Sequence, residues 1–225
     1  MINGPRWLYL HGFASGPRST KGVKLSEHFA ARGVALQRLD LRVPSLERLS
    51  FSTMMRVVGD ALGGARDRAV VFGSSLGGLT AARVAENDAR IAALVLLAPA
   101  FRIAERWRMR MTADEWRDWE TSGFLAIHDY AEDRPARVSF DFIRELETLD
   151  AAGGGWPDVR VPTLIVHGTR DDTVDPQLSR DFARGKPWVR LVEVDDGHEL
   201  TQSLERIAAE AEAFSSPFHD HFSRR

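Results

Sequence analysis

The chain has 225 residues, of which 44% are hydrophobic and 28% are charged, and its formal net charge is −2. This length fits one domain with a sizeable core and is too short for two full domains with a linker. The balanced charge gives no reason to expect a nucleic acid or an anionic membrane as a partner, and the absence of cysteine excludes disulfides, cysteine nucleophiles and thiolate metal sites.

The N-terminal segment MINGPRWLYL has no charged leader followed by a long apolar stretch, so the sequence does not predict a secretory signal. The longest apolar run, residues 91–100, contains Pro99 and is much shorter than the ~20 residues that cross a bilayer. A cytoplasmic protein without a membrane partner is therefore expected.

Short apolar runs alternate along the chain with segments of helical spacing. Strands are predicted at residues 7–10, 34–41, 69–72, 91–97, 163–166 and 189–194. A loop rich in Gly, Ser and Pro is expected at residues 14–24, and helices are predicted at 25–32, from Pro44 or Ser45 to Gly63, and at 79–86, 177–184 and 200–214. This alternation implies a mostly parallel sheet flanked by helices. The sequence thus predicts one α/β domain over residues 1–225.

One segment breaks the alternation. Between Pro99 and Pro162 no clean strand–helix–strand unit is found, and residues 101–150 have helical character with many charges. We therefore predict a small helical cap, inserted within residues 101–155 and lying over the sheet.

The predicted cap contains bulky side chains that are candidates for an acyl pocket: Trp107, Met109, Met111, Trp116, Trp119, Phe124 and Tyr130. Most of them are expected to bury the underside of the cap, because aromatic residues at helical spacing usually form a core. Trp107 and Trp116 are retained as candidate substrate contacts. Alternating arginines offer a site for an acidic substrate, but nearby carboxylates favour a solvated charged face; these arginines are Arg102, Arg106, Arg108 and Arg110.

The strand at residues 69–72 runs directly into Gly73-Ser74-Ser75-Leu76-Gly77, which matches G-x-S-x-G. In this pattern the serine stands on a sharp, strained strand-to-helix turn, and the glycines prevent clashes between the helix and the strand. The alternative is a turn that binds nothing; a phosphate loop is disfavoured because its glycine patterns are absent. Ser75 is the predicted nucleophile, and Ser74 has the wrong spacing.

A serine nucleophile needs a general base, and the base needs an orienting acid. With a G-x-S-x-G turn, the order along the chain is serine, acid, histidine. His198 fits this order because it follows a predicted strand and Gly197 and precedes the last helix. His219 and His221 lie in the polar tail and are expected to be solvated. His198 is therefore the predicted base.

The acid is expected on the loop after the preceding strand, which contains Asp171, Asp172 and Asp175. One of these carboxylates would hold the tautomer of His198 and stabilise its imidazolium. The other two would form turns or cap a helix. Spacing alone does not show which of the three aspartates is the acid.

Two N–H donors are needed for the oxyanion that develops during acyl transfer. One is the backbone N–H of Leu76, the residue after the nucleophile. The other is expected from Phe13, in the loop after the first strand, where Gly12 allows the backbone to fold beneath the substrate. His11 and Gly12 are also candidate substrate contacts; the alternative is that they only end the strand.

Together these motifs resemble those of the α/β-hydrolase superfamily. The matching segments are Leu10-His11-Gly12-Phe13, Gly73 to Gly78, His167 to Val174, and Gly197-His198. The N-terminal part, with Ser15, Pro17 and Ser19, is also similar to the start of small bacterial carboxylesterases. In the superfamily pattern His-Gly-x-x-Asp-x-x-Val, the first Asp is the catalytic acid, and it maps onto Asp171. The position after Val174 is commonly proline but is Asp175 here, which keeps Asp172 and Asp175 as alternatives.

The resemblance implies an α/β-hydrolase fold and hydrolysis of carboxylic esters, with short-chain acyl esters as the expected small-molecule substrates. It also implies an acyl-enzyme on Ser75 and no metal or organic cofactor. A thioesterase or peptidase with the same residues is one alternative. A catalytically inactive hydrolase fold that only binds a ligand is the other, although such proteins usually lose a triad residue.

Overall fold

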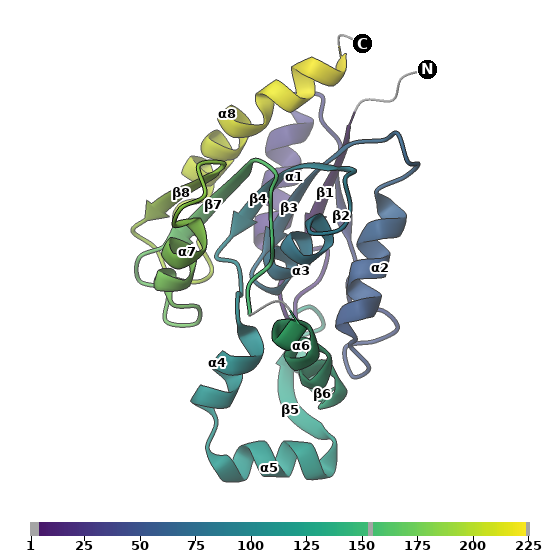
Figure 1. Cartoon of the computed structure of the whole chain (residues 1–225), viewed down its shortest axis with the longest axis vertical. Helices are drawn as coiled ribbons and strands as arrows, with labels where there is room; N and C mark the ends of the chain where they lie inside the picture. The colour runs from purple at the N-terminus through teal and green to yellow at the C-terminus, as the bar shows by residue number, and fades with distance from the viewer. Residues whose placement is uncertain (1–4, 153–154, 224–225) are drawn as a thin grey trace.

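The centre of the structure is a six-stranded sheet in which every neighbouring pair is parallel (Figure 1). Its strands, in spatial order, are β2 (Leu36–Leu39), β1 (Arg6–Leu10), β3 (Ala69–Ser74), β4 (Ile91–Leu97), β7 (Thr163–Gly168) and β8 (Val189–Val194). This computed structural model describes residues 5–152 and 155–223. The predicted mostly parallel α/β architecture is confirmed, and all six predicted strands are present.

Helices cover both faces of the sheet, because each central strand is apolar on both sides. These helices are α1 (Thr20–Ala30), α2 (Phe51–Ala61), α3 (Leu76–Ala85), α7 (Pro176–Ala183) and α8 (Leu204–Ser223). In β3, Val70 and Phe72 pack in one core with α1 and α8, whereas Val71 packs in the other core with α2, α3 and α7. Among the described residues, no helix combines the length and the apolar character needed to traverse a bilayer.

Two helices begin at positions that periodicity did not predict. The expectation of a loop at residues 14–24 is wrong in its second half, because α1 begins at Thr20; its first turn buries Lys21 and Gly22, which give no apolar period. The helix expected from Pro44 or Ser45 begins instead at Phe51, where Ser50 Oγ accepts a hydrogen bond from the Thr53 N–H at 3.2 Å. Such an N-cap fixes the start of a helix.

The insertion after β4 projects from the carboxyl edge of the sheet (Figure 1). It contains α4 (Ile103–Arg110), α5 (Ala113–Ser122), β5 (Phe124–Asp129), β6 (Arg134–Ser139) and α6 (Asp141–Ala152). The predicted helical cap therefore also holds an antiparallel hairpin of β5 and β6. The sequence did not predict this hairpin, because Pro135 and the charged residues of β6 weaken the strand pattern. Residues 153–154 of the predicted cap lie outside the described part.

Aromatic side chains form the core of the insertion. Trp119 is 1% exposed, and its Nε1–H donates to the carbonyl of Val138 at 3.2 Å. Trp116 packs edge-on against Trp119, with ring centroids 5.8 Å apart, and both rings contact Phe140. The expectation that these tryptophans bury the cap's own underside agrees with these contacts.

Arg83 of α3 connects this helix to the end of the insertion through an ion pair. Its side chain is 4% exposed and forms ion pairs with Asp150 at 2.8 Å and with Glu86 at 3.0 Å. Burial raises the pKa of the Asp150 carboxyl, and the hydrogen bond from Arg83 offsets this only in part. The Asp150 carboxyl is partly buried, so it needs the Arg83 guanidinium beside it to stay ionised.

We expect Arg83→Leu to lower the free energy of unfolding by about 3 kcal/mol, because it leaves a partly buried carboxylate without its partner. Urea denaturation measures the change. Arg56→Leu is the control, since Arg56 pairs with Asp60 at 3.4 Å on the exposed surface of α2, where such pairs contribute about 0.3–0.5 kcal/mol. Equal losses in the two variants would contradict this role of Arg83.

Candidate active site

Ser75 stands on the turn between β3, which ends at Ser74, and α3, which begins at Leu76. Its backbone has φ 53° and ψ −115°, a conformation that non-glycine residues rarely adopt. The two flanking glycines are required by close contacts. A Cβ on Gly73 would collide with the backbone of Gly77, and a Cβ on Gly77 would collide with the carbonyls at the end of β1. The sequence thus folds here into the predicted strand–turn–helix.

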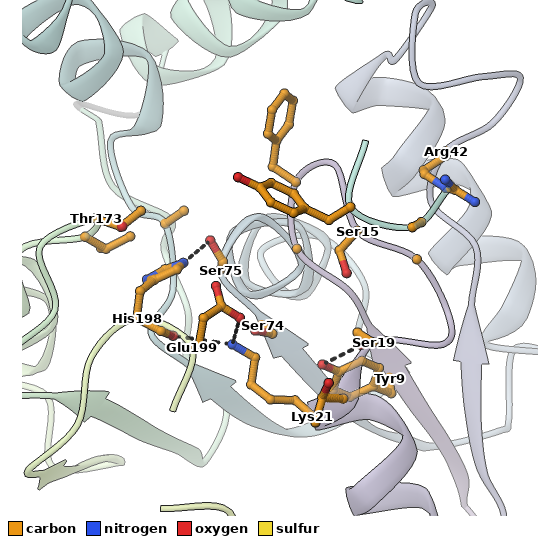
Figure 2. Close-up of a pocket in the computed structure, with 18 of the residues that line it drawn as sticks. Tyr9, Ser15, Ser19, Lys21, Arg42, Ser74, Ser75, Thr173, His198 and Glu199 are labelled. Carbon is orange, nitrogen blue, oxygen red and sulfur yellow. Dashed lines mark hydrogen bonds and ion pairs between the residues drawn. The ribbon is translucent and has the colours of Figure 1, made fainter. Parts of the chain in front are cut away.

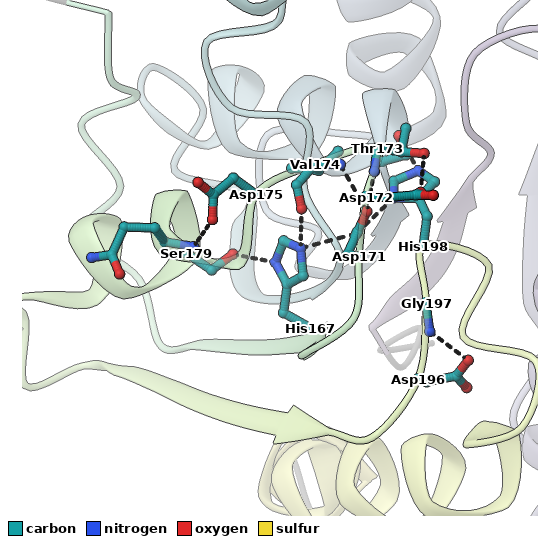
Figure 3. Close-up of polar contacts among 12 residues, drawn as sticks. His167, Asp171, Asp172, Thr173, Val174, Asp175, Ser179, Asp196, Gly197 and His198 are labelled. Atoms are coloured by element: carbon teal, nitrogen blue, oxygen red, sulfur yellow. Dashed lines mark hydrogen bonds and ion pairs between the residues drawn. The ribbon is translucent and has the colours of Figure 1, made fainter.

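The structure brings Ser75, His198 and Asp171 together in one hydrogen-bonded chain (Figures 2 and 3). His198 Nε2 lies 3.1 Å from Ser75 Oγ, and His198 Nδ1 lies 2.8 Å from Asp171 Oδ2. The three residues follow β3, β8 and β7, whose carboxyl ends share one edge of the sheet. With Nδ1–H donating to the carboxylate, Nε2 accepts the hydrogen of the serine hydroxyl, which is the tautomer that a general base requires.

The carboxylate of Asp171 is buried and fully engaged (Figure 3). Oδ1 accepts from the backbone N–H groups of Thr173 and Val174 at 2.9 and 2.7 Å. Oδ2 accepts from His198 and also from His167 Nε2 at 3.1 Å. Burial alone would raise the pKa of this carboxyl, but the hydrogen bonds from His167, His198 and Val174 outweigh it and hold the pKa well below its ordinary value. Asp171 therefore stays ionised beside His198.

His167, at the end of β7, is a second histidine on the same carboxylate. Its Nε2 faces two acceptors, Asp171 Oδ2 and the Val174 carbonyl at 3.0 Å, so Nε2 carries the hydrogen. Its Nδ1 lies 2.7 Å from Ser179 Oγ, which donates to it. This buried ring fixes the acid from the side opposite His198. In the sequence, His167 is recognisable only as part of a motif, because nothing in a single strand end reveals its partners.

The two alternative acids lie elsewhere. Asp172 is exposed, and its carboxylate accepts from the hydroxyl of Thr173 at 3.1 Å. Asp175 is the N-cap of α7 and accepts from the Gln177 N–H at 2.8 Å. Among the three aspartates that spacing left open, the geometry therefore selects Asp171 as the partner of His198.

The loop that carries His198 is anchored by residues that the sequence analysis did not single out. Asp196 is buried and accepts from the N–H groups of Gln202 and Ser203, both at 2.9 Å. Lys21 Nζ, from the first turn of α1, donates to the His198 carbonyl at 3.3 Å and pairs with Glu199 at 3.6 Å (Figure 2). Lys21 lies far from His198 in the sequence, so no local pattern predicts this contact.

Two further histidines of the C-terminal third were expected in the polar tail. His219 lies on α8, with its ring centroid 6.4 Å from that of Trp7. The side chain of His221 lies outside the described residues.

The proposed oxyanion donors lie on both sides of the nucleophile. Leu76 is the first residue of α3. The loop that carries Phe13 passes close to Ser75, since a Cβ on Gly12 would lie 3.4 Å from the Cβ of Ser75. Within the described part of the chain, neither the Phe13 N–H nor the Leu76 N–H donates to another protein group. Their role as oxyanion donors stays a prediction.

Four residues were predicted to contact substrate, and the structure separates them into two groups. Gly12 and Trp107 line a cavity beside Ser75, where Trp107 packs edge-on against Phe13. His11 is 2% exposed and braces its loop: Nε2 accepts from the Leu41 N–H at 3.0 Å, and Nδ1 donates to the Gly12 carbonyl. Trp116 lies in the core of the insertion. His11 and Trp116 are not among the residues that line the cavity.

The cavity has a volume of about 770 Å³ and opens above Ser75 and His198 (Figure 2). Its walls include residues 12, 13 and 15–21, then Ile103, Arg106 and Trp107 of α4, and Tyr130 in the turn between β5 and β6. Tyr9 lines it from β1; burial raises the pKa of its hydroxyl to about 12. A space of this size accommodates a small organic substrate.

The sequence matches the family described as Uncharacterised protein family (UPF0227) over residues 6–215. The chain belongs to this family. No curated protein matches the sequence of this UPF0227 member. The remaining comparisons are with solved structures.

Solved structures show the same fold at low sequence identity. Est1E from Butyrivibrio proteoclasticus, with ferulic acid bound, has a TM-score of 0.79 and 22% identity, covering 96% of this chain and 90% of that one. Mouse alpha/beta hydrolase domain-containing protein 10 has a TM-score of 0.75 and 18% identity, covering 96% and 91%. A monoacylglycerol lipase from Paleococcus ferrophilus has a TM-score of 0.74 and 19% identity, covering 95% and 96%. The predicted α/β-hydrolase fold is confirmed.

The depressed pKa of Asp171 gives a prediction for stability. Its ionised form contributes stability at pH values above the unfolded pKa of about 3.9, and this contribution is lost as the pH falls toward the lower folded pKa. We expect the difference in unfolding free energy between wild type and Asp171→Asn to be largest above about pH 5 and to shrink below about pH 4. Urea denaturation over this pH range measures it, with Asp172→Asn as the exposed control. Parallel curves for wild type and Asp171→Asn would contradict the prediction.

Proposed function

We propose that this protein is a serine hydrolase that cleaves carboxylic esters through an acyl-enzyme on Ser75. The observation that carries the proposal is the hydrogen-bonded chain from Ser75 Oγ through His198 to Asp171, with distances of 3.1 and 2.8 Å. A serine hydroxyl is a weak nucleophile until an adjacent base removes its proton. In this proposal His198 is that base and Asp171 is the acid that orients it.

In the first half of the reaction, Ser75 Oγ attacks the carbonyl carbon of the ester while His198 Nε2 takes the hydroxyl proton. The ionised carboxylate of Asp171 stabilises the imidazolium that forms. The negative oxygen of the tetrahedral intermediate accepts hydrogen bonds from the N–H groups of Phe13 and Leu76, and the N-terminus of α3 adds favourable electrostatics.

The intermediate collapses when His198 returns the proton to the leaving alkoxide, which departs as an alcohol and leaves the acyl group on Ser75. A water molecule then attacks the acyl carbon, with His198 again acting as the base, and the acid is released. Every proton in this cycle passes through His198 Nε2. Each step uses groups of this chain and substrate water.

Esters are proposed as the substrate class on the resemblance of the motifs, with support from similar structures. These include a monoacylglycerol lipase and Est1E with ferulic acid bound. Short-chain acyl esters suit a cavity of about 770 Å³. Its half-buried aromatic wall at Phe13 and Trp107 supplies an apolar surface for the acyl or alcohol group.

We expect a fluorophosphonate probe to label the wild-type protein and not Ser75→Ala, because the probe reacts with a serine activated by its base. The same variant should lose at least about 10⁴-fold in kcat toward p-nitrophenyl butyrate. Gel fluorescence and mass spectrometry of the labelled peptide identify the site. Ser74→Ala, one residue away, should still be labelled. Wild-type protein that remains unlabelled would overturn the proposal and favour a ligand-binding protein.

The bond type is tested by comparing kcat/KM for p-nitrophenyl esters, acyl thioesters and aminoacyl amides with matched acyl groups. We expect the oxygen esters to give the highest values. A higher kcat/KM for the thioesters or amides would replace ester hydrolysis by thioesterase or peptidase activity of the same triad.

A further inference from the structure

Charged residues on the cavity wall are mostly cationic. The cations are Arg18, Lys21, Arg42 and Arg106, and the carboxylate is Glu199. Lys21 is already paired with Glu199. Arg42 forms ion pairs with Asp40, Asp129 and Glu132 outside the cavity. Arg18 is exposed to solvent. Lys21 and Arg42 are therefore paired and Arg18 is solvated. Arg106 is the remaining cation of the cavity wall, and its charge needs a separate explanation.

Arg106 is partly buried and incompletely bonded. Its Nη2 donates to the carbonyl of Thr173, on the loop that carries the acid. Its Nη1 is buried and is the one buried side-chain nitrogen or oxygen without a hydrogen-bond partner in the described part of the chain. No carboxylate among the described residues forms an ion pair with it. A buried charged donor that is left unpaired is costly, so this atom indicates a missing partner.

The two sides of Arg106 differ in charge. On one side it borders a depression where carboxylates outnumber the other guanidinium groups; the charged lining residues there are Glu105, Asp171, Asp172, Asp175, Arg102 and Arg110. On the other side lies the Ser75 cavity, whose one lining carboxylate is paired with Lys21. An anion is repelled by the first environment and attracted by the second.

The guanidinium keeps its charge at neutral pH. Burial and the nearby charge of Arg110 lower the pKa of Arg106 to about 10, which is still well above 7. A substrate carboxylate beside the guanidinium, where Arg106 lines the Ser75 cavity, would compensate this buried charge, and guanidinium groups bind carboxylates in this way.

We propose that Arg106 is a specificity-determining residue that binds a carboxylate carried by the ester substrate, an inference that rests on the proposed hydrolase function. Ile103, Arg106 and Trp107 lie at helical spacing on α4 and line the cavity together. The substrate's apolar part contacts Ile103 and Trp107, and its carboxylate meets Arg106 while its ester carbonyl lies at Ser75. The preferred substrates are therefore half-esters of dicarboxylic acids or esters of a carboxylated alcohol or phenol.

Two matched pairs of substrates test the proposal. Monophenyl adipate and phenyl hexanoate differ in a carboxylate on the acyl side, and 4-acetoxybenzoate and its methyl ester differ in a carboxylate on the leaving group. For at least one pair, we expect Arg106→Gln to lower the ratio of kcat/KM for the anionic ester to that for the neutral ester by roughly 10- to 100-fold, mainly through KM. Arg106→Lys, which keeps the charge, should restore part of the ratio.

Arg110→Gln is the matched control. Arg110 lies one helical turn after Arg106 and donates to the carbonyl of Asp172, but it does not line the Ser75 cavity. This variant should leave the ratio unchanged. If Arg106→Gln lowers kcat/KM equally for anionic and neutral esters, or leaves both ratios unchanged, Arg106 only holds the acid loop and the proposal is overturned.

The test also separates this proposal from the proposed function. If no neutral ester is hydrolysed and the fluorophosphonate probe does not react, the hydrolase assignment fails. Calorimetric titration of adipate into wild type and Arg106→Gln needs no turnover. We expect adipate to bind the wild type at least about tenfold more tightly. Equal affinity, or no binding to either protein, would overturn the carboxylate site.

Discussion

The carboxylate of Asp171 is the constraint on which the rest of the site depends. It joins the end of β7, through His167, to the loop after β8, through His198, and its other oxygen is held by the acid loop's own amides. Hydrogen bonds to a charged group each contribute roughly 1.5–3 kcal/mol, so rotation of this carboxylate is strongly opposed. The imidazole of His198 is thereby held 3.1 Å from Ser75 Oγ. Proton transfer between the two residues requires such a fixed geometry.

Backbone contacts at the carboxyl edge of the sheet set the positions from which these side chains reach one another. A Cβ on Gly77 would strike the end of β1, and a Cβ on Gly168 would strike the backbone at Asp196 and Gly197. The turn that carries Ser75 is therefore packed against the loop of Phe13, and the end of β7 is packed against the loop of His198. Because backbone is in contact with backbone, the distances between nucleophile, base, acid and oxyanion donors are fixed by the main chain more than by flexible side chains.

Much of this arrangement could be predicted from the sequence, for identifiable reasons. A strand buried on both faces is a continuous apolar run, so the predicted strand at residues 91–97 has both ends correct. The turn that carries Ser75 is predictable because strand, glycines and helix form one local pattern. The sequence could not choose Asp171 from its neighbours by spacing, since that depends on which carboxylate meets His198 in space. The roles of Lys21, His167 and Arg106 could not be predicted, because they are set by partners elsewhere in the fold, as with the Thr173 carbonyl 67 residues from Arg106.

Helix α4 links the choice of substrate to the catalytic geometry. One of its faces lines the cavity with Ile103, Arg106 and Trp107, while Arg106 and Arg110 bind the backbone carbonyls of Thr173 and Asp172. Those carbonyls immediately follow Asp171, so a displacement of α4 is transmitted to the acid within two residues. Arg106 therefore contacts both the cavity and the loop that carries the acid. Substitutions at Met109, which is 76% exposed and does not line the Ser75 cavity, leave both unaffected, since neither the cavity wall nor the bonds to the acid loop involve its side chain.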